Sequence, residues 1–557
     1  MYKKELFLPA LLVILFGIFL YSNVINGKFV WDDNILLAEN VYIEGRAGLP
    51  EIFTRDIGSG YGIKFNYYRP LQISSYKLEH AFWGLDHRGY HITNILLHIL
   101  TALCVLYLAF ALWGNRLLAF LAGMIFVSHP VQTETVAYIS NRGDLLCALF
   151  FMVSFIFYIR YIKYKNTYLY VLMAISYLFS LLSKENALMF MGILIIYHYT
   201  FKEKLKLKYF LFPLGITVIY LFFRSVFLGP VLPKVTDIQA IFSRVPGFFA
   251  AIAGYLGLLI FPLGLHFDYG NKTFAVADPR VIIGVIFVSL VIVCAAANRN
   301  KNKVICFSAF WFLAMLIPVS NIYPKTAFYM AEHHLYMPLA GFAFIAAYYL
   351  SLLYRQWFFK IAAVCVMAAL FIFYGYSTIR QNNYWLEPVN FYLRTLEFNP
   401  YSAVARYNLG KEYERAGNDA MAITMYKKTI EMDSNYDNAY NNLGVIYSRL
   451  NNNEEALEMF RKTLEINPKS APAYTNLGAL YYRLNKRAEA VSFLKKALEA
   501  KPDHAAAHYN LAVVYYYQKE YGLAIEHCDR ALKQGYKVSP DFFTLLQPYR
   551  KITETIP

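Results

Sequence analysis

Two adjacent acids, Asp32 and Asp33, follow directly on the first long apolar run of the chain, residues 6–25. Charged side chains are common where a loop meets water, so the pair fits an ordinary solvated loop. The same position would also let a carboxylate act as a general base on a substrate that is carried in the membrane. The choice between these interpretations depends on which other polar groups lie on the same side.

Further polar groups border the apolar runs along the chain, and ionisable groups at membrane depth normally face a cavity or a pathway. Glu134 and Glu185 add acids, whereas Arg69, Lys184 and His333 add potential cations. A carboxylate base that faces several cations suits the transfer of a group from a lipid phosphate. The base removes a proton from the acceptor hydroxyl, and the cations stabilise the departing phosphate.

These residue types predict three sets of functional side chains. The predicted catalytic acids are Asp32 and Asp33. The predicted contacts to the donor phosphate are Arg69, Arg142, Lys184 and His333, and the side chains predicted to line the site are His91, His129, Glu134, Glu185, Glu332 and Tyr336.

Some of these side chains also have structural explanations. Arg142 can form a local ion pair with Asp144, and His98 fits a hydrogen bond between packed helices better than a metal ligand. His333 and His334 would point to different faces of a helix, so no metal site is predicted there. Adjacent acids can hold a divalent metal, but two alone do not complete its coordination shell, so no cofactor is predicted.

The composition is that of a membrane protein. Of 557 residues, 58% are hydrophobic and only 16% are charged, against roughly 25% charged residues in soluble domains. Lys3 and Lys4 precede the first apolar run, which is too long for a secretory signal and has no cleavage site, so we expect an anchor span. The six cysteines form neither a disulfide framework nor a CxxC metal pair.

Ten apolar runs are long enough to cross a membrane, at about 20 residues per helix. They cover residues 6–25, 92–112, 145–162, 168–182, 187–201, 209–228, 281–297, 304–320, 335–353 and 361–378. A weaker run, 113–131, makes eleven, and we expect one more, 247–263, to be re-entrant or interfacial.

The charge distribution predicts the topology. The net charge of +16 is concentrated in residues 1–400, where 32 Lys and Arg stand against 19 Asp and Glu. The basic clusters at 160–165, 202–208, 299–303 and 355–360 are expected on the cytoplasmic side. Eleven spans then place the C-terminus and all of the polar groups of interest on the outer side.

From about residue 401 the chain becomes a repeat array. The sequence Asn-Leu-Gly begins at Asn408, Asn442 and Asn476, 34 residues apart, and tyrosines and alanines recur with the same period. This is the pattern of tetratricopeptide repeats, in which each helix pair buries its apolar face on the next pair. We therefore predict an all-α protein that joins a polytopic membrane domain to a C-terminal α-solenoid.

The predicted domains are a transmembrane domain over 1–380 with a large outer loop at 26–90, a linker over 381–400, four tetratricopeptide repeats over 401–537, and a capping helix and tail over 538–557.

Several short motifs, in this order and followed by the repeats, resemble the TMTC group, the transmembrane and tetratricopeptide-repeat O-mannosyltransferases. They are Trp31-Asp32-Asp33, Tyr68-Arg69-Pro70-Leu71, Tyr90-His91-Ile92-Thr93-Asn94 with His98, His129-Pro130 through Asn141-Arg142-Gly143-Asp144, Ser183-Lys184-Glu185, and Ala331-Glu332-His333 through Tyr336-Met337-Pro338.

This resemblance implies a membrane glycosyltransferase of the GT-C type, which takes its sugar from a polyprenyl or dolichyl phosphate. It implies that Asp32 and Asp33 occupy the base position and that residues 183–185 and Glu332 line the site. The chain departs from the family pattern at His333, where an arginine is usual, and in having about four repeats. The short array suggests a bacterial or archaeal relative, for which the sugar need not be mannose.

The favoured hypothesis is an inverting transferase that moves a hexose from a polyprenyl-phosphate donor to Ser/Thr hydroxyls of a protein held by the repeats. We expect it in the bacterial inner membrane, or in the endoplasmic reticulum if the source is eukaryotic, and expect no nucleic-acid partner. One alternative acceptor is a lipid-linked glycan, as for a polymerase or ligase. A different alternative is a non-catalytic membrane scaffold that recruits proteins through its repeats.

Overall fold

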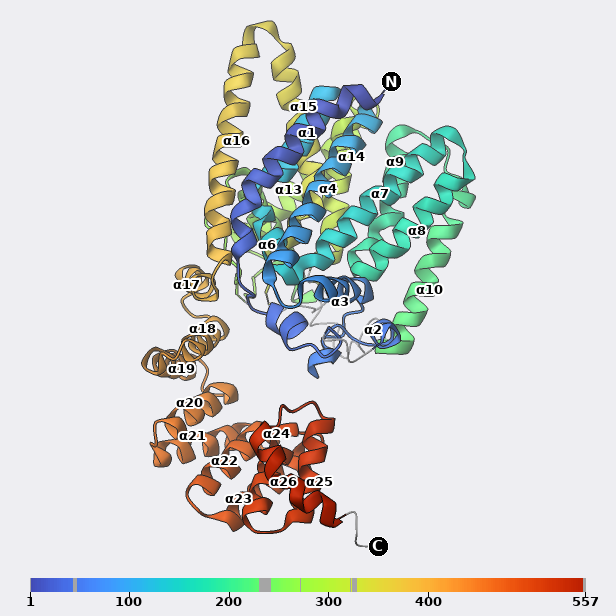
Figure 1. Ribbon diagram of the computed structural model, residues 1–557. Coiled ribbons are helices and arrows are strands. Elements are labelled where there is room, and N and C mark those ends of the chain that lie inside the picture. The colour runs from blue at the N-terminus through green and yellow to red at the C-terminus, as the bar shows by residue number, and fades with distance from the viewer. Residues whose placement is uncertain are drawn as a thin grey trace. The chain divides into compact units, whose positions relative to one another are not determined.

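The computed structural model describes residues 2–43, 48–229, 242–270, 272–320, 322 and 328–553, and within these ranges every regular element is helical (Figure 1). The chain divides into two compact units, Met1–Pro400 and Tyr401–Pro557. The first unit carries the apolar helices, and the second carries the repeats. The predicted all-α fold is confirmed.

Among the described residues, six helices of the first unit are long and apolar enough to cross a membrane. They include α1 (Tyr2–Tyr21), α4 (His87–Trp113), α7 (Arg142–Tyr164), α10 (Leu211–Leu228), α13 (Pro279–Ala297) and α16 (Lys360–Asn382). The pair formed by α5 (Arg116–Ser128) and residues 130–137 is bent by 50° and would add a seventh span if it crosses as one piece.

The prediction of eleven spans exceeds this number. Helices do form at the other apolar runs, but α8 (Thr167–Ser183), α9 (Phe190–Phe201) and α14 (Lys303–Leu316) have only 17, 12 and 14 residues. At 1.5 Å per residue they measure about 18 to 26 Å, less than the ~30 Å of a bilayer core. The 18 residues of α15 (Pro338–Arg355) include three tyrosines and an arginine.

Helix α12 (Val245–Ile260) occupies most of the run that was expected to be re-entrant or interfacial, and it has 16 residues. It packs on α13, where the Phe249 carbonyl oxygen lies directly against Gly284. A β-carbon at Gly284 would overlap that oxygen, so only glycine permits the approach of the two helices.

The segment expected to be a linker, 381–400, is instead a packed part of the first unit. It contains η11 (Asn383–Trp385) and α17 (Pro388–Phe398), and Trp385, Phe391 and Tyr392 are buried. Their rings contact Trp31 and Phe267, so burial of aromatic surface holds this segment in place. The segment lacks a long apolar run, so its burial is not visible in the sequence pattern.

The second unit consists of four antiparallel helix pairs and a last helix. The pairs are α18–α19 (Ala403–Arg415, Asp419–Met432), α20–α21 (Asp437–Arg449, Asn453–Ile466), α22–α23 (Ala471–Arg483, Arg487–Ala500) and α24–α25 (Ala505–Tyr517, Tyr521–Lys533). Gly444 lies under the ring of Phe460 and Gly478 under Leu494, so the repeated glycine lets the helices of a pair approach. Helix α26 (Pro540–Thr553) buries Phe542 and Leu546, and residues 554–557 lie outside the described ranges.

Candidate active site

One short segment, residues 134–144, contacts the polar groups that the sequence singled out. It comprises α6 (Thr133–Ala137), η5 (Ile139–Asn141) and the first turn of α7. Because the backbone changes between helix types here, successive side chains leave it in different directions. The contacts run from Glu134 to His333, from Tyr138 to Asp32, from Ser140 to Asp33, from Arg142 to Glu79, and from Asp144 to Lys184.

Asp33 fixes the first loop to this segment. Its Oδ1 accepts hydrogen bonds from the Ser140 backbone N–H at 2.8 Å and hydroxyl at 2.6 Å, and its Oδ2 accepts one from the Val30 N–H at 3.0 Å. Only 1% of the residue is exposed. Burial raises the pKa of Asp33 to about 7, although the hydrogen bonds from Ser140 and Val30 oppose the shift. Both carboxylate oxygens are therefore engaged within the protein.

Asp32 has a different environment because it is only partly buried. Burial raises the pKa of Asp32 to about 6, against the effect of its hydrogen bond with the Tyr138 side chain. The Tyr138 hydroxyl also accepts a hydrogen bond from the Asp32 backbone N–H at 3.1 Å. Trp31 has a φ of 52°, which is rare for an aromatic residue, and its ring packs 4.7 Å from that of Phe267. This packing fixes the turn that presents Asp32.

Two adjoining ion pairs bring two cations together. The Arg69 Nη2 lies 3.5 Å from Glu185 Oε2, and the Lys184 Nζ lies 2.6 Å from Asp144 Oδ2. Burial alone would lower the pKa of Arg69, but the carboxylates of Glu185 and Asp144 outweigh it and raise that pKa. The two pairs therefore form one cluster.

Tyr67 joins this cluster to Asp32. Its ring centroid lies 4.6 Å from the Arg69 guanidinium carbon. Burial raises the pKa of Tyr67, and the charges that act on its phenol belong to Arg69, Glu185, Asp56 and Asp32. Asp56 itself accepts the Tyr67 N–H at 2.7 Å and so holds the turn before Arg69. The buried Arg69 Nε has no hydrogen-bond partner among the described residues, which leaves a donor for an anionic ligand.

A second cluster surrounds Glu134 and Glu332, each 1% exposed. Glu134 accepts the His333 backbone N–H at 3.0 Å and lies 2.6 Å from His333 Nδ1. Glu332 accepts the His266 N–H at 2.6 Å and the Tyr269 hydroxyl at 2.8 Å. Burial, reinforced by the nearby charge of Glu134, raises the pKa of Glu332 well above its ordinary range. Phe267, which contacts Trp31, follows His266 directly and connects this cluster to the Asp32 turn.

Four predicted site residues occupy structural positions instead. The Arg142 side chain is 0% exposed, and its guanidinium donates to Glu79, Asn94 and the Tyr90 carbonyl. Its carboxylate partner is Glu79, not Asp144, and these bonds hold the guanidinium among the helices of the unit. Three more side chains are buried and hydrogen bonded to other segments of the unit. His91 bonds to the Gly27 carbonyl, His129 bonds to the Leu259 carbonyl, and Tyr336 bonds to His98.

Sequence reasoning missed several contributors, namely Asp56, Tyr138, Ser140, His266 and Tyr269. Tyr138 and Ser140 stand inside a stretch that the sequence had marked, but their partners are more than 100 residues away. His334 bonds to Tyr255 while His333 bonds to Glu134, so the two rings serve different contacts. Within the described part of the chain, no group of three or more His, Cys, Asp or Glu side chains is arranged to hold a metal ion.

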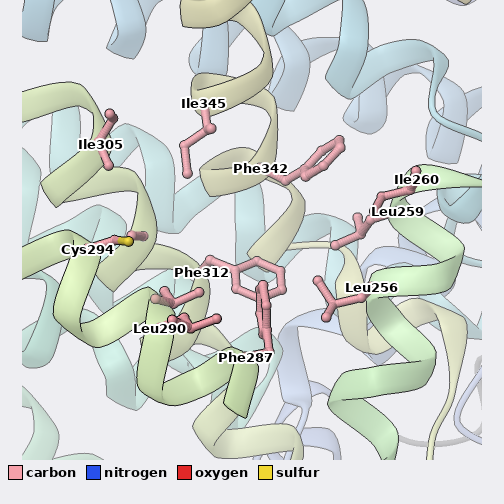
Figure 2. Close-up of a pocket in the computed structure, with 12 residues that line it drawn as sticks. Leu256, Leu259, Ile260, Phe287, Leu290, Cys294, Ile305, Phe312, Phe342 and Ile345 are labelled. Atoms are coloured by element: carbon pink, nitrogen blue, oxygen red, sulfur yellow. The ribbon is translucent and has the colours of Figure 1, made fainter. Parts of the chain in front are cut away.

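A separate apolar cavity lies among α12, α13, α14 and α15 (Figure 2). Its volume is about 440 Å³, and every side chain that lines it is apolar or, in one case, a cysteine. In Figure 2, Leu256, Leu259 and Ile260 of α12 face Phe287, Leu290 and Cys294 of α13 across the space. Leu259 also accepts the hydrogen bond of His129, which lies five residues before Glu134.

These features define a helical membrane protein with a polar, acid-containing site beside its spans and a tetratricopeptide-repeat unit. Models of the tetratricopeptide repeat match residues 403–436, 436–503 and 475–537. The resemblance to the TMTC group is confirmed by relatives named protein O-mannosyl-transferase.

The chain is 28% identical over 425 residues to the protein O-mannosyl-transferase F38B6.6 of Caenorhabditis elegans, and the matched region covers 72% of this chain and 59% of the relative. It is 26% identical over 475 residues to the protein O-mannosyl-transferase TMTC4 of Homo sapiens, and that match covers 72% of this chain and 63% of the relative. The chain thus spans about three fifths of the length of these relatives. Among solved structures, MamA is 23% identical over 26% of this chain and 86% of its own, with a TM-score of 0.24.

Proposed function

We propose that this protein is a membrane glycosyltransferase that moves a hexose, mannose or another, from a polyprenyl-phosphate donor to Ser/Thr hydroxyls of a protein acceptor. The main support for the proposal is that the two adjacent acids differ in hydrogen bonding and in exposure. Asp33 is fully hydrogen bonded and anchors the loop, whereas Asp32 is partly exposed, and its charge acts on the phenol of Tyr67 together with those of Arg69 and Glu185. The names of the relatives support the same chemistry.

In this mechanism Asp32 removes the proton of the acceptor hydroxyl, and the hydroxyl oxygen attacks the anomeric carbon. The bond from that carbon to the phosphate oxygen breaks, and its electron pair leaves with the lipid phosphate. Arg69, through its unpartnered Nε, and Lys184 stabilise the growing negative charge, and His333 does so from the second cluster. A single displacement of this kind inverts the anomeric configuration.

Other parts of the chain have roles in this proposal. The apolar cavity of Figure 2 suits the prenyl chain of the donor, since its walls offer no polar group. The repeats would hold the acceptor polypeptide and lower the entropic cost of the encounter. The site and the repeats would then lie on the outer face of the membrane, as the basic clusters predict.

The test measures hexose transfer by purified, membrane-reconstituted variants. Asp32→Asn should lower kcat by about 10²–10⁴-fold, the usual contribution of a general base, with unchanged thermal stability. Glu203→Gln, which follows α9, is the matched control and should behave as the wild type. Full activity of Asp32→Asn would remove Asp32 as the base.

The acceptor is tested by deleting residues 401–557, which form a compact unit of their own. Loss of transfer to protein, with transfer to a short Ser/Thr peptide retained, is expected. Unchanged transfer to a lipid-linked glycan, with none to either peptide or protein, would favour a polymerase or ligase instead.

A further inference from the structure

A second cavity lies at the other ends of three helices that carry the candidate active site. Its volume is about 400 Å³, and it is lined by Glu5, Tyr107, Phe110, Ala111, Gly114, Ile159, Arg160, Lys163 and Tyr164. These residues stand at the start of α1 and at the ends of α4 and α7. Asp32, His91 and Asp144 lie beyond or near the opposite ends of the same helices. The cavity is therefore separate from the candidate active site.

The charges around this cavity are unbalanced. Its one acid, Glu5, is engaged by Arg116, with Nη2–Oε1 and Nε–Oε2 distances of 2.6 and 3.1 Å. Arg160 and Lys163 form no ion pair with any residue in the described ranges. Their charged groups lie over tyrosine rings instead, Arg160 at 5.6 Å from Tyr107 and Lys163 at 5.4 Å from Tyr164. Two uncompensated cations thus border the cavity.

The cavity also has an apolar wall. Phe110 and Ala111 from α4 and Ile159 from α7 line it beside the cations. A ligand that fits has an anionic head and an apolar portion. An anionic phospholipid has a charged headgroup and apolar acyl chains next to each other. Basic pockets between membrane helices bind such headgroups. Tyrosines such as Tyr107 and Tyr164 are enriched where membrane helices meet the lipid headgroups.

We propose that this cavity binds the phosphate headgroup of an anionic phospholipid, in the leaflet that the basic clusters predict to be cytoplasmic. Arg160 and Lys163 contact the phosphate oxygens, because guanidinium and ammonium groups form charge-assisted hydrogen bonds to phosphate. Phe110 and Ile159 contact the apolar part of the lipid. The Arg116 pair prevents Glu5 from repelling the headgroup.

The test uses the full-length protein in detergent and measures the thermal shift produced by phosphatidylglycerol, with phosphatidylcholine as the neutral lipid. The double variant Arg160→Ala/Lys163→Ala should raise the apparent Kd for phosphatidylglycerol by about tenfold or more, since two charge-assisted contacts are lost. The matched control is Lys206→Ala/Lys301→Ala, which removes two charges from other basic clusters. Its apparent Kd should equal that of the wild type.

An equal loss of affinity in the control variant would overturn the proposal, because it would show a general effect of surface charge. An unchanged Kd in the cavity variant would also overturn it. Inorganic phosphate added without lipid distinguishes the source of the phosphate. If it reproduces the full thermal shift of the wild type, the site binds free phosphate and the lipid proposal fails. Glu5→Gln should bind phosphatidylglycerol as well as the wild type or more tightly.

Discussion

The ammonium group of Lys184 lies 2.6 Å from the Asp144 carboxylate, and the side chains are only 9% and 4% exposed. Lys184 stands at the break between α8 and η6 (Glu185–Met189), where its N–H donates to the Ser180 carbonyl. The neighbouring Glu185 turns toward Arg69. Two consecutive residues therefore serve two ion pairs, and one helix break brings both pairs together.

Substitution of this buried pair separates a structural role from a functional one. Lys184→Met leaves the Asp144 charge buried without its partner, so the free energy of unfolding should fall by about 3–5 kcal/mol. The double variant Lys184→Met/Asp144→Leu should recover most of that stability, because an apolar pair can replace a buried ion pair. Thermal unfolding and hexose transfer are measured on both variants. The double variant should remain inactive, and wild-type transfer would show that Lys184 does not contact the donor.

The dependence of activity on pH should follow the ionisation of the Asp32 carboxyl group. A base acts only when ionised, and the pKa of Asp32 is raised to about 6 by burial. The value of kcat/KM should therefore be flat above pH 6 and fall tenfold per unit below it. The hydrogen bond from Tyr138 lowers this pKa, so Tyr138→Phe should move the acid limb to higher pH. Ser140→Ala is the control, because it removes a hydrogen bond of Asp33 and should leave the limb in place. A limb that does not move in Tyr138→Phe would contradict Asp32 as the base.

The sequence predicted the elements better than their contacts. The 34-residue period located the repeats. Polar residues in the stretches between apolar runs singled out Asp32, Arg69, Lys184 and His333 as candidates. Periodicity carries no information on which distant groups meet, however. Glu134 reaches His333 across 199 positions, and Arg142 pairs with Glu79, 63 positions away, instead of with Asp144 nearby.

Among the described residues, six helices are long and apolar enough to cross a membrane, against the eleven spans predicted. A window of apolar residues shows that a segment avoids water, but not where its helix ends. Helix α9 stops at Phe201 after 12 residues, and several of its apolar side chains are buried within the unit. The packed segment 383–398 was missed for the opposite reason, since isolated aromatic residues such as Trp385 and Phe391 produce no apolar window.

His333 offers a test of how the donor phosphate is held. A guanidinium carries a fixed charge and donors that suit a phosphate, whereas a glutamine side chain carries no charge. If His333 contacts the phosphate, the KM for the lipid donor should rise in His333→Gln and stay near the wild-type value in His333→Arg. The measurement is the KM for the lipid donor, with kcat followed in parallel. An identical KM in all three proteins would show that His333 only anchors Glu134.

The close packing within each repeat predicts how the second unit responds to substitution. A β-carbon on Gly478 would lie 2.6 Å from Leu494 Cγ and 3.2 Å from the Ala490 carbonyl oxygen. Gly478→Ala should therefore lower the free energy of unfolding of the repeats by about 1–3 kcal/mol, the usual cost of overpacking. Gly522→Ala in α25 is the matched control, since nothing lies within 4 Å of its β-carbon position and alanine favours a helix.

Hydrogen exchange of residues 401–553, followed by mass spectrometry, measures this difference in the full chain. Faster exchange in Gly478→Ala should be confined to the repeats, because they form a compact unit of their own. Transfer to a short peptide should then match the wild type while transfer to a protein acceptor falls, since only the second requires the repeats. Equal transfer to both acceptors in a protein with loosened repeats would mean that the repeats do not hold the acceptor.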